Sequence, residues 1–177
     1  MKYTIRRAKA DDIQMVIDLA VEMVVHSLSP FRETSREEIR EFRRTDLAVL
    51  KNAERHENIG IFIAEDEEKC FIGHVIVVGG DVETSTGEKQ GWVFDLSVKE
   101  EHWSSGIGKT LMLKAEEFVK GLGLKYLGMG VTTSNERAVR FYERCGYREE
   151  RKRMIKRILR DRSLPEQPLC LLLLSCF

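Results

Sequence analysis

The stretch WSSGIGKT, Trp103–Thr110, decides how the fold of this 177-residue chain is interpreted. It follows an apolar run, residues 92–98, that is typical of a β-strand, and it opens a segment with apolar residues at helical spacing. Its ending, Gly-Lys-Thr, is that of a P-loop. Its Gly-x-Gly core is instead typical of a turn that binds a pyrophosphate through backbone N–H groups. The two interpretations predict different ligands.

The P-loop interpretation conflicts with two features of the sequence. The motif requires a glycine five residues before Gly108, where this chain has the bulky Trp103. An NTPase of this kind also needs a strand that ends in an Asp to hold magnesium, and residues 125–135, KYLGMGVTTSN, contain none. We therefore favour an anion site at the start of the helix, formed by the N–H groups from Ser104 to Lys109.

A second motif, NERAVRFYERCGY at residues 135–147, follows an apolar strand pattern at residues 125–132. Together the two motifs resemble the GCN5-related N-acetyltransferase (GNAT) superfamily. Its loop reads [Arg/Gln]-x-x-Gly-x-[Gly/Ala], and its later helix reads Asn-x-x-Ala-x-x-Phe-Tyr-x-x-x-Gly-[Phe/Tyr]. The positions of this chain that match the helix motif are Asn135, Ala138, Phe141, Tyr142, Gly146 and Tyr147.

The resemblance implies a mixed α/β fold in a single domain over residues 1–177. It implies a central, twisted, mostly antiparallel sheet of about seven strands, flanked by four helices, with strands four and five splayed apart. The apolar patterns predict strands at residues 3–7, 59–64, 71–78, 92–98, 125–132, 151–159 and 169–176. The predicted helices begin at Asp11 or Asp12, at a Ser35–Glu38 capping box, after Gly108 and at Asn135. Phe42 is expected on the inner face of the second helix, and Val24 on that of the first.

The resemblance also implies an activity, the transfer of an acetyl group from acetyl-CoA to a primary amine. The acceptor is either a small molecule or the N-terminus of a protein or peptide. The pantetheine arm is expected between the splayed strands, against the backbone of Leu96, Ser97 and Val98. Tyr142 is expected to act as general acid toward the leaving thiolate. The remaining cofactor-binding residues that the resemblance implies are Trp103, Ser104, Ser105, Gly106, Ile107, Gly108, Lys109, Asn135, Ala138 and Phe141.

The general base is not identified by the sequence. Strand alternation places Trp92, Phe94, Leu96 and Val98 on one face, which then carries no carboxylate, and turns Asp95 to the other face. Bulk water serving an amine of low pKa is an alternative to a protein base. The other candidates by location are Glu65, His74, Glu100, Glu101 and His102, each of which is more typical of an ordinary surface residue.

The loop departs from the family pattern at two positions. Trp103 stands where the family has Arg or Gln, and Ser105 stands where a basic residue is common. A charged contact to phosphate is worth roughly 1.5–3 kcal/mol, so weaker cofactor binding is expected. An alternative function is therefore a non-catalytic acyl-CoA-binding module that acts through protein partners.

Composition narrows the partners and the compartment. Lys plus Arg and Asp plus Glu balance at 29 each, so no net charge favours nucleic acid or a membrane surface. The four cysteines lack metal-ligand spacing, so we expect no metal and reduced thiols in the cytoplasm. We expect Ser27–Ser35 to shape the acceptor pocket. The apolar segment Leu169–Phe177 is expected to be either a covered strand or a homodimer contact.

Overall fold

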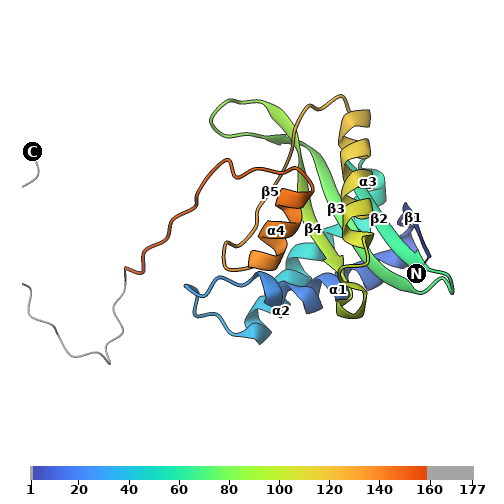
Figure 1. The fold of residues 1–177 in the computed structure, drawn as a ribbon, viewed down its shortest axis with the longest axis horizontal. Helices are drawn as coiled ribbons and strands as arrows, with labels where there is room; N and C mark the ends of the chain where they lie inside the picture. The colour runs from blue at the N-terminus through green and yellow to red at the C-terminus, as the bar shows by residue number, and fades with distance from the viewer. Residues whose placement is uncertain (1, 159–177) are drawn as a thin grey trace, which may run out of the picture.

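The computed structural model describes residues 2–158 of the chain (Figure 1). Within that range the strands are β1 Tyr3–Arg7, β2 Ile59–Asp66, β3 Phe71–Val82, β4 Lys89–Val98 and β5 Leu127–Met129. The α-helices are α1 Ile13–Met23, α2 Arg36–Leu47, α3 Ile107–Gly121 and α4 Glu136–Arg144. Short 3₁₀ segments are η1 Ala10–Asp12, η2 Val24–Ser27, η3 Ala48–Arg55 and η4 Glu100–His102. The predicted mixed α/β fold with helices around one sheet is confirmed.

The strands form one sheet in the order β1-β2-β3-β4-β5. The first four strands pair antiparallel, and β5 joins β4 in parallel, so the sheet is mostly antiparallel as predicted. Figure 1 shows α1 and α2 together on the lower side of the view, α3 lying along β3, and α4 beside β4.

Two apolar clusters pack on the two opposite faces of this sheet. Ile63 of β2 and Ile76 of β3 face α1 and the segment after α2, in one cluster. Val75 and Val77 of β3 point the opposite way and pack with α3, in the other cluster. Aromatic side chains of α4 are partly buried against that second cluster. We call these the α1/α2 face and the α3/α4 face, and they follow from the period-two alternation of β3.

A β-bulge interrupts β4 at Phe94. Consecutive residues of β3 pair with Asp95 and with Val93, which leaves Phe94 as an extra residue without a cross-strand partner. Val93 and Leu96 consequently pack in the same cluster on the α3/α4 face. The predicted strict alternation over residues 92–98 is therefore wrong, because one inserted residue reverses the side-chain direction beyond it.

The edge of β4 beyond the bulge is open on the β5 side. Parallel pairing joins only Gly91–Val93 to Leu127–Met129. Within residues 2–158, residues 95–98 pair with β3, and residues 94–98 have no strand on their other edge. The predicted separation of the fourth and fifth strands is confirmed, and it exposes backbone N–H and C=O groups that another extended chain could bond.

Helix starts follow the predicted caps with one exception. Ser35 and Glu38 form the predicted capping box of α2, and Asn135 Oδ1 accepts from the Ala138 N–H at 3.1 Å at the start of α4. Asp12 is the residue before α1, but its side chain does not cap that helix. Its Oδ2 instead accepts from the Lys9 N–H at 2.7 Å, because a 3₁₀ turn precedes the helix.

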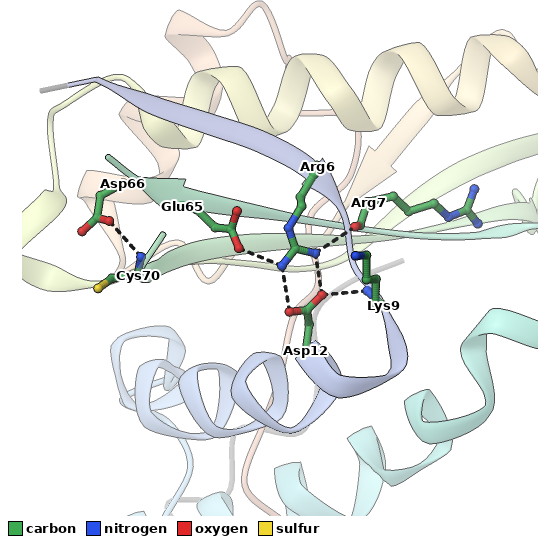
Figure 2. Close-up of polar contacts among 7 residues, drawn as sticks. All are labelled: Arg6, Arg7, Lys9, Asp12, Glu65, Asp66 and Cys70. Carbon is green, nitrogen blue, oxygen red and sulfur yellow. Dashed lines mark hydrogen bonds and ion pairs between the residues drawn. The ribbon is translucent and has the colours of Figure 1, made fainter. Parts of the chain in front are cut away.

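The Asp12 carboxylate belongs to an ion-pair network that ties the first helix to the sheet (Figure 2). Arg6 donates to Asp12 Oδ2 at 2.6 Å and to Glu65 Oε1 at 2.7 Å, and so connects β1, α1 and β2. The hydrogen bond from Arg6 lowers the pKa of Asp12, although burial opposes that shift. The same two hydrogen bonds raise the pKa of Arg6. The network keeps the Asp12 carboxylate ionised, and both carboxylates have a structural role in it.

Several predicted element bounds are wrong. The strand predicted at residues 125–132 shortens to three residues, because only Leu127–Met129 pairs with β4. Residues 151–158 form no strand; they are dense in Arg and Lys and offer no apolar face to the sheet. The strand predicted at residues 169–176 lies outside the described residues. Phe42 is 71% exposed rather than inward, and Val24 begins η2 rather than extending α1.

Candidate active site

The loop that opens α3 has the backbone shape of an anion site. Ser104 and Gly106 adopt positive φ values of 65° and 90°, which turn the chain sharply out of β4 and into the helix. Ile107 anchors the first turn of α3 in the core, and the side chains of Ser104, Ser105 and Lys109 stay exposed. The first N–H groups of this 15-residue helix have no intrahelical acceptor, so they can bind an anion.

The motif helix α4 packs directly over this loop. A Cβ placed on Gly108 would lie 3.3 Å from the Phe141 ring, so the glycine allows the two helices to approach. Phe141 and Tyr142 contact edge to face, with ring centroids 5.1 Å apart. Both rings are partly buried on the α3/α4 face, beside Leu96 and Val98 of the open edge of β4. The structure thus brings together the loop, the open edge and the predicted acid.

The Tyr142 hydroxyl has the protonation state that a general acid needs. Burial, and secondarily the nearby charge of Asp95, raise the pKa of Tyr142 to about 12. Within residues 2–158 no protein group hydrogen-bonds this hydroxyl. By contrast, the neighbouring Tyr147 donates to Glu116 Oε1 at 3.0 Å. Tyr142 therefore keeps its proton at neutral pH, and within the described part of the chain no internal acceptor holds it.

Trp103 lies across the end of β4. Its indole N–H donates to the Val98 carbonyl at 2.7 Å, and its ring meets His26 edge to face with centroids 5.3 Å apart. The guanidinium of Arg137, in the first turn of α4, stacks on the Trp103 ring, with its Cζ 3.3 Å from the ring centroid. Of the predicted contacts to the pantetheine arm, the Val98 carbonyl thus already uses one of its two lone pairs.

Asn135 is also engaged within the protein. Its Oδ1 caps α4, and its Nδ2 donates to the His26 carbonyl of η2 at 2.9 Å. Thr132 makes a parallel contact, donating from Oγ1 to the Ser27 carbonyl at 2.6 Å. The side-chain amide of Asn135 therefore fixes the start of α4 against η2, and a direct contact of this residue with the arm remains a prediction.

Asp95 is held by three donors on the α1/α2 face. Its Oδ1 accepts from Ser97 Oγ at 2.7 Å and lies 2.9 Å from His74 Nε2, while Arg43 donates to Oδ2 at 2.6 Å. Desolvation raises its pKa, but the His74 and Arg43 contacts outweigh this and lower the pKa of Asp95 to about 2. A carboxylate so stabilised is a poor base, so Asp95 fixes α2 to the bulge instead.

The other base candidates are also committed to structural contacts or exposed. His74 is completely buried, not a surface residue as expected, and stacks on Phe71. Glu65 is 8% exposed and pairs with Arg6, again unlike a surface residue. Glu100 pairs with His26 at 2.8 Å at the surface. Neither these residues nor Asp95 presents an unengaged carboxylate to the open edge of β4.

No group of three or more His, Cys, Asp or Glu side chains among residues 2–158 is arranged to hold a metal ion. No helix in that part of the chain has the length and apolar character needed to cross a membrane.

Comparison with known proteins decides the family. The sequence profile of the acetyltransferase (GNAT) family matches residues 17–147, which is more than half of the chain. The chain belongs to the GNAT acetyltransferase family. The match includes both motifs and all strands from β2 to β5, so the resemblance inferred from the loop and α4 is confirmed.

Individual relatives agree with this assignment. This GNAT chain is 30% identical over 107 residues to spermidine N(1)-acetyltransferase of Vibrio cholerae, a match that spans 59% of each protein. A Pyrococcus furiosus protein provisionally assigned as an acetyl transferase superposes with a TM-score of 0.72 at 29% identity, over 89% of this chain and all of that one. Glucosamine-6-phosphate N-acetyltransferase of Arabidopsis thaliana shares the fold, with a TM-score of 0.61 at 18% identity over 89% and 99% of the two chains.

Three residues of this GNAT site escaped the sequence analysis: Arg137, Arg43 and His26. Arg137 lies between two motif positions, Asn135 and Ala138, where the family pattern leaves the residue free. Arg43 comes from α2 and His26 from η2, and both lie more than 50 residues before the loop in the sequence. Trp103 and Ser105, which replace polar or basic residues of the family pattern, are the signal in the sequence that a cation could come from another element.

Proposed function

We propose that this GNAT protein transfers an acetyl group from acetyl-CoA to a primary amine, with Tyr142 as the general acid. The observation that carries the proposal is the open edge of β4 over residues 94–98, which lies in the same cluster as Tyr142. An extended amide-containing arm can pair there as a strand would, and its far end can meet the anion site at the start of α3.

The residues present fit such a ligand. The backbone of Leu96, Ser97 and Val98 would bond the arm, while the N–H groups of Ser104 to Lys109 would bind the pyrophosphate. Phe141 packs against the same apolar cluster as Leu96 and Val98 and would supply an apolar wall. Gly106 adopts a positive φ without strain, and because it has no side chain it leaves the loop backbone accessible where phosphate would approach.

The reaction needs few groups from the protein. The amine nitrogen attacks the thioester carbonyl, a C–N bond forms and the C–S bond breaks. A backbone N–H on the open edge of β4 would stabilise the oxyanion, and Tyr142 would give its proton to the leaving sulfur. Because Asp95 is held at a pKa of about 2, we propose that the amine's proton leaves to water.

An amine acceptor is supported by one relative in particular. The Vibrio cholerae relative is a spermidine acetyltransferase, although its match spans 59% of that protein. We therefore place polyamines first among the acceptors and peptides with a free N-terminus second. The exposed Phe31 lies in Ser27–Ser35, the segment that we propose shapes the acceptor pocket, and the exposed Phe42 lies in the helix α2 that follows it.

The experiment is an acceptor screen at fixed acetyl-CoA. Release of the CoA thiol is followed with spermidine, glucosamine 6-phosphate and a peptide with a free N-terminus, and products are checked by mass spectrometry. We expect thiol release that depends on the amine and a product heavier by one acetyl group. Saturable binding of acetyl-CoA without thiol release for any amine would contradict catalysis and favour the non-catalytic acyl-CoA-binding alternative.

A further inference from the structure

The loop of the anion site carries less positive charge than its role requires. Trp103 stands where the family has Arg or Gln, and Ser105 stands where a basic residue is common, which leaves Lys109 as the one cation among residues 103–110. Lys109 lies beyond the Gly-x-Gly turn, in the first turn of α3. The N-terminal side of the loop therefore has no cation of its own.

Arg137 approaches that side from α4. Its Cζ lies 3.3 Å from the centroid of the Trp103 ring, so the guanidinium is in stacking contact with the indole. A stacked guanidinium keeps the N–H groups of its edge available for a phosphate. Within residues 2–158, Arg137 makes no hydrogen bond or ion pair, whereas Arg140, one turn later, pairs with Glu136 at 2.9 Å.

The platform under Arg137 is fixed. The Trp103 indole N–H is bound to the Val98 carbonyl at 2.7 Å, and the ring is braced edge-on by His26. His26 is in turn held by Glu100, at 2.8 Å. A rotationally fixed platform reduces the side-chain entropy that Arg137 loses when it binds an anion.

We infer that Arg137, stacked on Trp103, is the residue that binds the phosphates of the CoA moiety in place of the basic residue missing from the loop. Trp103 then serves as the support for a cation supplied by another helix. The inference rests on the proposed function, since it takes acetyl-CoA as the ligand. It makes Arg137 a cofactor-binding residue and Trp103 and His26 positioning residues.

The test compares acetyl-CoA dissociation constants, measured by calorimetry, for the wild type, Arg137→Gln, Arg137→Lys and the control Arg140→Gln. Losing a charged contact to phosphate should weaken binding to Arg137→Gln by roughly tenfold to a hundredfold. Arg137→Lys keeps the charge and should lose less. Arg140→Gln, a basic residue on the same helix that already has a partner, should bind within about twofold of the wild type.

Two shortened ligands show that the effect runs through phosphate. S-Acetylpantetheine carries no phosphate, so Arg137→Gln should bind it as the wild type does in ligand-observed NMR. Acetyl-3′-dephospho-CoA assigns the contact: an undiminished loss points to the pyrophosphate, and a vanished loss points to the 3′-phosphate.

The outcomes separate this inference from the proposed function. Wild-type affinity for acetyl-CoA in Arg137→Gln, or an equal loss for S-acetylpantetheine, would overturn the role of Arg137 while leaving acetyl transfer in place. Failure of the wild type itself to bind acetyl-CoA would overturn the proposed function.

Discussion

The two faces of the sheet use charge in opposite ways. On the α1/α2 face, carboxylates are locked in ion pairs, Asp12 and Glu65 with Arg6, and Asp95 with Arg43 and His74. On the α3/α4 face, the partly buried groups beside the open edge of β4 are aromatic rings and backbone amides. Tyr142, on that face, has a raised pKa, whereas Asp95 on the other has a lowered one.

This difference shows which groups are left for chemistry. A carboxylate that accepts from three donors has lost its basicity, so the charged face stabilises the fold and the position of α2. A neutral phenol beside unpaired backbone donors retains its proton and its freedom to give it. We therefore propose that catalysis takes place on the α3/α4 face and that the ion pairs of the α1/α2 face stabilise the fold.

The largest effect is expected from Tyr142→Phe. Removing a general acid should lower the turnover number for acetyl transfer by about a thousandfold, within the range typical of acid–base catalysis. Acetyl-CoA affinity, measured by calorimetry, should change by less than about twofold. Tyr147→Phe is the matched control, since it removes a hydroxyl from the adjacent ring and should leave turnover unchanged. Equal turnover in the wild type and Tyr142→Phe would remove catalysis from this hydroxyl.

Asp95→Asn should destabilise the ion pairs of the α1/α2 face. Loss of the carboxylate leaves the buried His74 without its partner and the partly buried Arg43 with Asp46 alone, which should lower the free energy of unfolding by about 3 kcal/mol. The control is Asp46→Asn, which removes a more exposed partner of the same Arg43 and should cost less than about 1 kcal/mol. Urea titration monitored by circular dichroism measures both. Equal costs for the two variants would deny Asp95 its structural role.

The same variant has a pH signature with a definite sign. The folded pKa of Asp95, about 2, lies below its usual value of 3.8, so its ionised form stabilises the folded state fully above that usual value. That stabilisation is lost as the pH falls through 3.8 toward 2. The stability difference between the wild type and Asp95→Asn should therefore shrink between about pH 5 and pH 2. A difference that stays constant over this interval would contradict the assignment.

Gly106→Ala tests the backbone conformation of the loop that opens α3, on the α3/α4 face. The φ of 90° at Gly106 is unfavourable for alanine, although its Cβ would meet only the Tyr3 hydroxyl, 3.8 Å away. Backbone strain should cost about 1–2 kcal/mol of stability in urea titration, with weaker acetyl-CoA binding. Gly121→Ala, at the end of α3 where a Cβ meets nothing, should be neutral or slightly stabilising. A loss of the same size in Gly121→Ala would mean that the loop conformation is not the cause.

The smallest expected signal is spectroscopic. The pKa of Tyr142 is about 12, so its tyrosinate absorbance should appear about two pH units above that of an ordinary tyrosine near 10. The measurement is the difference between alkaline titrations of the wild type and Tyr142→Phe. A midpoint near pH 10 in this difference would show that the ring is not desolvated as described.

Features of the fold that depend on neighbouring residues were predicted correctly from the sequence, whereas features that depend on distant residues were not. Ser35 with Glu38, and Asn135 with Ala138, interact within one helical turn, so their patterns predicted both helix starts correctly. The bulge at Phe94 depends on pairing with β3, about 20 residues away, and no local pattern marked it. Pairing with β5 ends at Val93, directly before this bulge, and Asp95, directly after it, contacts Arg43.

The candidate site shows the same limit. The loop, the open edge and Tyr142 all lie on motif positions, so the resemblance located them. The sequence did not show that Glu65 and Asp95 form ion pairs, because their partners Arg6 and Arg43 are distant in the sequence. It also did not show that His74 is buried. The Trp103–Arg137 stack joins two motifs through side chains that neither motif specifies.

The most direct test of the central claim is a calorimetric titration of acetyl-CoA into the wild-type protein, repeated with saturating Mg-ATP present. The account predicts saturable binding of acetyl-CoA that Mg-ATP does not displace, because the anion site at the start of α3 is continued by the open edge of β4 and Tyr142. Binding of Mg-ATP without any binding of acetyl-CoA would contradict the account and return WSSGIGKT to the P-loop interpretation.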